Sequence, residues 1–102
     1  MAGFIDIGCN FTHPSLRENL DEILKNAEEV DVTKFVLLCA SLNDLDSIQE
    51  IQKQDLSKYF VTAGIHPHHA NEILDLGDQN LFNLLKASTP HAIGETGLDY
   101  FR

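Results

Sequence analysis

The sequence of 102 residues is poor in cysteine, in positive charge and in long apolar runs. Its two cysteines, Cys9 and Cys39, follow neither a disulfide framework nor a zinc-finger spacing, so we expect reduced thiols. No apolar stretch approaches the roughly 20 residues that a membrane-spanning helix needs, and the first residues lack the pattern of an export signal. We therefore expect a cytoplasmic protein, or a nuclear one if the source is eukaryotic, without a membrane partner.

Positive charge is outnumbered by negative charge. Seven Lys and Arg stand against sixteen Asp and Glu, and the formal net charge at pH 7 is -9. A field of this sign does not attract nucleic acid or an anionic membrane, so an anionic ligand needs a local site or a bound cation. A hydrophobic content of 43% with 23% charged residues is typical of a soluble globular domain and excludes a disordered chain.

Short apolar runs alternate with amphipathic stretches along the whole chain. The runs predict strands, the first of them buried and the second covered on both faces, over residues 2–9, 33–39, 59–64 and 91–94. The amphipathic stretches predict helices over residues 16–27, 41–53 and 80–86, while 71–76 is left undecided. Ser15 and Glu18 fit a capping box at the start of the first helix. The order favours parallel strands with right-handed crossovers, in a doubly wound sheet or in the first half of a (β/α)8 barrel.

In both architectures, ligands gather where the strands end. Three histidines, His66, His68 and His69, directly follow the third predicted strand. Imidazole can bind a metal, act as a general base or hold a phosphate, and the alternative is a solvent loop rich in histidine.

Two carboxylates also stand out. Glu95 lies between Gly94 and Gly97 at the end of the fourth predicted strand, where it can bind a metal ion that activates water or can belong to a solvated turn. Asp6 lies inside an apolar run, and a buried carboxylate must be paired or protonated. Asp6 can therefore support a site residue or serve as a structural hydrogen-bond acceptor.

Three segments together resemble the first three sequence blocks of the TatD family, at residues 4–12, 63–68 and 92–99. The Gly-Glu-Thr-Gly-Leu-Asp block is the most specific of them. TatD proteins are metal-dependent deoxyribonucleases related to amidohydrolases. The resemblance implies an α/β fold in which parallel βα units form the first half of a TIM (β/α)8 barrel, with residues 1–102 as the amino-terminal half of a TatD-like hydrolase domain.

The resemblance also implies roles for individual residues. Glu95 matches the metal-ligating glutamate and His66 lies beside the substrate phosphate, so both are expected to be catalytic. His68 is expected to bind substrate as well. Asp99 completes its block and is expected to orient the loop. Independently of the resemblance, Asp6 is expected to support a neighbouring site residue.

The first block departs from the pattern of many family members. Gly8 and Asn10 stand where those members have a His-x-His pair. Asn10 is then either a weaker oxygen ligand of the metal or the cap of a turn.

The implied reaction is hydrolysis of DNA phosphodiester bonds by water activated by one or two divalent ions, Mg²⁺, Mn²⁺ or Zn²⁺. A barrel of this type needs about 250 residues, and two further histidines and an aspartate of the family pattern are absent from this sequence. We therefore expect a fragment that is inactive alone and self-associates through unpaired sheet edges. The alternatives are a non-catalytic half-barrel module that self-associates, or a TatD-like hydrolase of another ester.

Overall fold

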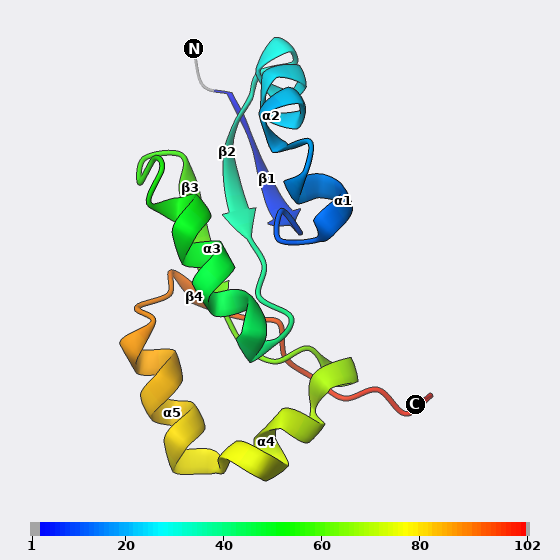
Figure 1. Ribbon diagram of the computed structural model, residues 1–102, viewed down its shortest axis with the longest axis vertical. Coiled ribbons are helices and arrows are strands. Elements are labelled where there is room, and N and C mark those ends of the chain that lie inside the picture. The colour runs from blue at the N-terminus through cyan, green and yellow to red at the C-terminus, as the bar shows by residue number, and fades with distance from the viewer. Residues whose placement is uncertain (1–2, 102) are drawn as a thin grey trace.

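Four parallel strands form a single sheet in a computed structural model that describes residues 3–101 (Figure 1). The strands are β1 (Phe4–Cys9), β2 (Val32–Leu37), β3 (Tyr59–Ala63) and β4 (Ala92–Ile93). They lie side by side in the order of the chain, as in the wall of a barrel, whereas a doubly wound sheet reverses its strand order. The predicted first half of a (β/α)8 barrel is therefore confirmed. Ala2, which falls within the first predicted strand, lies outside the described residues.

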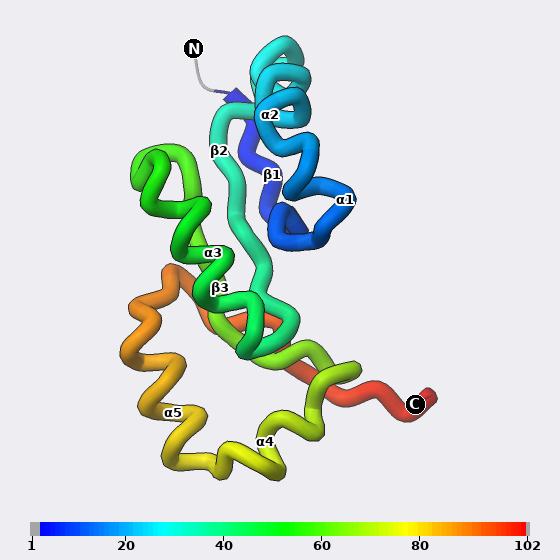
Figure 2. The backbone as a smooth tube through the Cα atoms, viewed as in Figure 1, coloured from blue at the N-terminus to red at the C-terminus, as the bar shows by residue number. Residues whose placement is uncertain are grey.

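Helices connect each strand to the next. They are α1 (Pro14–Arg17), α2 (Leu20–Glu29), α3 (Leu45–Gln52), α4 (Asn71–Leu76) and α5 (Asp78–Ala87), with 3-10 turns η1 (Leu42–Asp44) and η2 (Pro67–His69). Helix α2 packs against β2 and α3 packs against β3, while α4 and α5 form an arch at the opposite end of the molecule from α2 (Figure 2). The undecided segment 71–76 is thus a helix. None of the helices in residues 3–101 is long and apolar enough to span a membrane.

The first predicted helix is interrupted, which corrects the expectation of one helix over 16–27. Glu18 and Asn19 separate α1 from α2. The amide of Asn19 donates to the carbonyl oxygen of Ser15 at 3.2 Å, which offers that carbonyl an alternative to the helical bond. The expected capping box is also wrong, because the N-cap is His13, whose Nδ1 accepts the backbone N–H of Ser15 at 3.2 Å.

The core lies between α3 and one face of β2 and β3. Alternate strand residues point to that face, which buries Phe35 and Leu37 of β2 and Val61 of β3. Ile48 and Ile51 of α3 belong to the same cluster and are 1% and 0% exposed. The apolar residues on one side of α3 therefore pack against the alternate apolar residues of β2 and β3 in one layer.

The face of the sheet away from α3 and the β1 edge stay open, so the expectation of a buried first strand is wrong. The register pairs Ile5 with Lys34 and Val36 with Phe60 on this face. Ile5 is 52% exposed and Ile7 is 76% exposed. Among the described residues, β1 pairs only with β2, so its other edge lacks a covering strand. The second strand is likewise not covered on both faces, because it is best buried where it meets α3.

The short strand β4 is attached to β3 partly through His91, which directly precedes it. The His91 N–H donates to the carbonyl oxygen of Val61 at 2.9 Å, and its ring Nδ1 accepts the Val61 N–H at 3.1 Å. The ring also meets Phe60 edge-on, with 5.1 Å between the ring centroids. These contacts fix the strand that leads to Glu95.

Truncation of Ile48 tests the position of the core. We expect Ile48→Ala to lower the free energy of unfolding by about 2–5 kcal/mol, because it opens a cavity in the apolar layer. Leu74→Ala is the control, since Leu74 is 83% exposed, and its effect should stay within about 0.5 kcal/mol. Urea unfolding measures both values, and equal losses for the two variants would contradict this placement of the core.

Candidate functional site

A cleft of about 440 Å³ opens at the carboxyl ends of the strands. Its lining includes Asn10 after β1, Asp44 after β2, His66 and His68 after β3, and Glu95 after β4. Segments from all four strand ends therefore meet in one place, as expected for the rim of parallel βα units. Four of the predicted site residues, Asn10, His66, His68 and Glu95, share this cleft.

Two consecutive carbonyl groups after β2 bind the backbone N–H groups of Glu95 and His66. The oxygen of Cys39 accepts the N–H of Glu95 at 2.9 Å, and the oxygen of Ala40 accepts the N–H of His66 at 2.7 Å. The loop after β2 thus fixes the loops after β3 and β4 in relation to each other. This shared anchor brings Glu95 and His66 together although they lie 29 positions apart in the sequence.

Close approach of the β3 and β4 exits requires a glycine at position 64. A Cβ atom on Gly64 would lie 2.6 Å from the carbonyl carbon of Gly94, closer than real contacts allow. The backbone of Gly94 and Glu95 fits against β3 only because Gly64 has no side chain.

The side chains of His66 and Glu95 face each other across the cleft. His66 Nε2 lies 3.7 Å from Glu95 Oε1, and both side chains are partly exposed. The other ring nitrogen, Nδ1, accepts the backbone N–H of His68 at 3.0 Å. Because Nδ1 is an acceptor, the proton of the neutral ring is on Nε2, and His66 presents an N–H donor to the cleft.

The carboxylate of Asp99, six residues after the end of β4, holds the ring of His68. His68 Nε2 and Asp99 Oδ2 are 2.7 Å apart, and Asp99 Oδ1 accepts the N–H of Phe101 at 2.9 Å. The Phe101 N–H and the His68 ring hold the pKa of Asp99 below its ordinary value. The rings of His66 and His68 lie edge to face, with 4.4 Å between their centroids. Asp99 therefore reaches the cleft through His68.

Asp6 lies outside this cluster. We expected it inside a buried strand, but it is exposed, because β1 forms the open edge of the sheet. Its Oδ1 accepts the N–H of Gly8 at 3.0 Å, within the irregular stretch of β1 that precedes Asn10. The carbonyl oxygen of Asn10 accepts the N–H of His13 at 3.0 Å and begins the turn into α1.

Metal ligation by the described residues is incomplete. Within residues 3–101, no three His, Cys, Asp or Glu side chains converge as a metal ion requires. A catalytic zinc site uses three protein ligands, whereas this cleft pairs Glu95 with one imidazole that turns an N–H toward it. The donors present match part of a metal site and do not form a complete one.

The thiol of Cys39 contacts backbone carbonyl groups beside the cleft. Cys39 is 0% exposed, and its Sγ contacts the carbonyl oxygens of Ser41 at 3.2 Å and Gly64 at 3.3 Å. Burial raises the pKa of this thiol. Cys9 is also buried and free, and burial together with Asp6 raises its pKa to about 12. Both cysteines are free thiols as predicted, and their raised pKa values disfavour the reactive thiolate form.

Sequence reasoning missed two carboxylates near the cleft, Asp44 and Glu72. Asp44 completes a capping box with Ser41 at the start of η1, and the Ser-x-x-Asp spacing was a signal that could have revealed it. Glu72 contacts Ser41 and Leu42, which lie about 30 positions away in the sequence, so no local pattern marks it.

The fold and the site together define the carboxyl rim of the first half of a (β/α)8 barrel, where barrel enzymes place their active sites. The model of the family described as "TatD related DNase" matches residues 5–102. The chain therefore belongs to the TatD family, as its sequence blocks predicted.

Curated relatives in several bacteria are named 3'-5' ssDNA/RNA exonuclease TatD. The chain is 35% identical to the protein of Erwinia tasmaniensis and 34% identical to that of Erwinia amylovora, over 99 residues in each case. It is 30% identical to the protein of Pantoea ananatis over 97 residues. The matches cover 95% of this chain but only 37–38% of the relatives, so the chain spans little more than a third of their length.

Replacement of Asp99 tests its pairing with His68. The folded pKa of Asp99 is lowered, so its stabilising contribution is present above the unfolded pKa of about 3.9 and is lost as the pH falls through the folded value. We expect Asp99→Asn to lower the free energy of unfolding at pH 7, with a difference from the wild type that shrinks as the pH falls below about 4.

Urea unfolding across this pH range measures the effect of Asp99→Asn. Glu29→Gln removes an exposed carboxylate from α2 and is the matched control. A difference between wild type and Asp99→Asn that stays constant or grows toward acid pH would contradict the pairing.

Proposed function

We propose that this chain supplies the first four strands, with the helices between them, of a metal-dependent nuclease that hydrolyses phosphodiester bonds in DNA. The observation that carries the proposal is the pair of Glu95 and His66, placed 3.7 Å apart at the barrel rim by two consecutive carbonyl groups. The TatD family is generally metal-dependent, and its curated relatives are named as exonucleases. A strand-end carboxylate beside an N–H donor suits a site that receives both a cation and a phosphate.

Glu95 is the residue of this chain that we assign to a divalent ion, Mg²⁺, Mn²⁺ or Zn²⁺. Hard cations prefer carboxylate oxygens, and Asn10 on the same cleft offers a weaker amide oxygen. Such an ion, when bound, lowers the pKa of a water molecule and polarises a phosphoryl oxygen. The remaining ligands must come from residues beyond those described here, because the cleft lacks a third converging donor.

His66 and His68 are the residues that we assign to the substrate phosphate. His66 presents its Nε2 proton to the cleft, so it can donate to a phosphoryl oxygen while Nδ1 stays bonded to the backbone. His68 lines the same cleft, and the bond to Asp99 fixes its ring. Asp6, through Gly8, supports the backbone that leads to Asn10.

The acidic chain can accept a polyanion at this cleft only through local groups. The net charge is -9, and the described lining of the cleft contains imidazoles and carboxylates but neither Lys nor Arg. A bound cation and the N–H groups of the histidines would therefore receive the strand. Because the relatives are named ssDNA/RNA exonucleases, single-stranded DNA is the first substrate to test.

The open apolar surface supports the inference that the four strands belong to a larger barrel. Ile5 and Ile7 on β1 and Ile93 on β4 are all more than half exposed. Further strands would cover these residues and would also bring additional ligands to the rim. A second copy could cover the same edges, and sedimentation of the protein distinguishes the two arrangements.

Glu95→Gln tests the proposed function in the complete enzyme. The substitution keeps the shape of the side chain but removes the charge that holds the cation, so we expect metal-dependent cleavage of labelled single-stranded DNA to fall on the order of 100-fold or more. Glu50→Gln is the matched control, because Glu50 is an exposed glutamate of α3 that pairs with Arg17 away from the cleft.

Wild-type activity in Glu95→Gln would remove Glu95 from the metal site and overturn the proposal. The same assay on a small phosphodiester, bis(p-nitrophenyl) phosphate, identifies the substrate class. Turnover of the small diester without cleavage of DNA would identify a hydrolase of another ester.

A further inference from the structure

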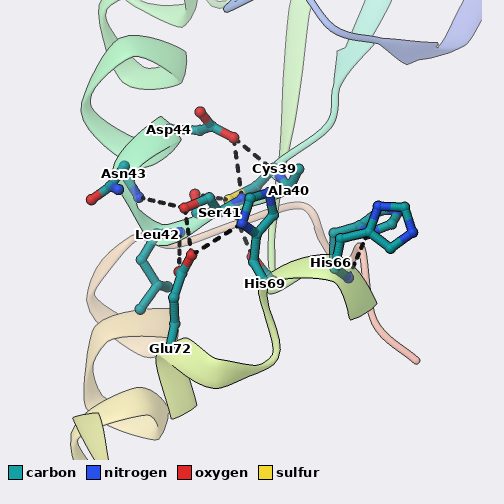
Figure 3. A network of polar contacts seen from close by, with 11 residues as sticks. Cys39, Ala40, Ser41, Leu42, Asn43, Asp44, His66, His69 and Glu72 are labelled. Atoms are coloured by element: carbon teal, nitrogen blue, oxygen red, sulfur yellow. Dashed lines mark hydrogen bonds and ion pairs between the residues drawn. The ribbon is translucent and has the colours of Figure 1, made fainter. Parts of the chain in front are cut away.

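Glu72, on α4, joins two loops that border the cleft. Its Oε2 accepts the hydroxyl of Ser41 at 2.7 Å, and its Oε1 accepts the backbone N–H of Leu42 at 2.9 Å (Figure 3). Ser41 is only 8% exposed, and the Glu72 side chain is 27% exposed. Both carboxylate oxygens are thus engaged by donors from the β2 exit loop, which we define as residues 39–44.

Asp44, the last residue of the β2 exit loop, binds the backbone of the same loop. Its Oδ2 accepts the backbone N–H groups of Ser41 at 3.1 Å and Ala40 at 3.3 Å. Figure 3 shows Glu72 and Asp44 reaching Ser41 from opposite sides, with the main chain of the loop between them. The loop that supplies the carbonyl groups for His66 and Glu95 is therefore clamped by two carboxylates.

The histidine turn, residues 66–69, is tied to this loop directly at its first residue and through Glu72 at its last. At its first residue the N–H of His66 donates to the carbonyl oxygen of Ala40 at 2.7 Å. At its last residue the Nδ1 of His69 lies 3.7 Å from Oε2 of Glu72. Glu72 lies only three residues after His69. Its hydrogen bonds to Ser41 and Leu42 therefore connect the end of the turn back to the β2 exit loop.

We propose that Glu72 is a positioning residue of the nuclease site, which holds the histidine turn against the β2 exit loop and so keeps His66 facing Glu95. Without the clamp, the turn keeps its attachment through Ala40 but loses its second anchor. A displacement of the order of 1 Å at a reacting group costs as much as 100-fold in rate. This inference rests on the proposed function, because it assigns Glu72 a part in that reaction.

Glu72→Gln and Ser41→Ala in the complete enzyme test the inference. Glu72→Gln removes one charge-assisted acceptor, and Ser41→Ala deletes the buried hydroxyl that it binds. We expect Glu72→Gln to lower kcat for single-stranded DNA about 10-fold to 100-fold with a smaller change in KM, since partners that orient a site residue have effects of this size. Asp75→Asn, an equal charge change at an exposed position of the same helix, is the matched control.

All rates are measured well below the lowest melting temperature of the set, so that every variant is folded. A purely structural role would lower the melting temperature and leave kcat and KM of the folded enzyme unchanged. Because Glu72 and Ser41 act as one unit, the double variant should lose no more activity than Glu72→Gln alone. If Glu72→Gln fails to fold, Ser41→Ala carries the test with the carboxylate in place.

A second readout does not depend on nuclease activity. In the metal-free complete protein, the imidazole NMR signals of His66 and His69 should shift in Glu72→Gln and stay unchanged in Asp75→Asn. Unchanged signals, or shifted signals with wild-type kcat, would overturn the positioning role of Glu72. Full activity in Glu95→Gln would instead overturn the proposed function, and the two failures are therefore distinguishable.

Discussion

The site depends on one backbone constraint, the two successive carbonyl groups of Cys39 and Ala40 at the end of β2. In a parallel sheet, neighbouring strands end at the same rim, but their exits are free to diverge. Here the two carbonyl oxygens bind the N–H groups of Glu95 and His66, which set the distance between a carboxylate and an imidazole. Gly64 makes the arrangement sterically possible, because a side chain there would collide with Gly94.

The two faces of the sheet differ in burial. The face toward α3 carries the closely packed core of Leu37, Ile48 and Ile51, and Cys39 of the β2 exit loop belongs to the same buried cluster. The opposite face and the β1 edge leave Ile5 and Ile7 exposed. Exposed apolar residues on an unpaired strand edge favour association with further strands. The half-barrel therefore combines a packed core on one face with an exposed apolar edge at β1.

The sequence was sufficient for the order of the strands, because continuous apolar runs alternate with helical periodicity. It also located Glu95 and His66 at the strand ends where the cleft opens, while their catalytic roles stay predictions. Prediction from the sequence failed where tertiary contacts determine the local structure. Asn19 interrupts a helix through a side-chain bond that periodicity does not register. Asp6 is exposed because its strand is at an edge, which hydrophobic pattern alone does not indicate. Glu72 was missed because its partners lie far away in the sequence.

The most direct test of the account is a crystal structure of the complete enzyme with Mn²⁺, whose anomalous signal locates the ion without assumptions. The account predicts that a carboxylate oxygen of Glu95 ligates the ion and that further strands cover the β1 edge. It also predicts that His66 lies beside the ion, with its backbone N–H still bonded to the carbonyl oxygen of Ala40. An ion bound away from Glu95, or a Glu95 side chain turned out of the cleft, would contradict it.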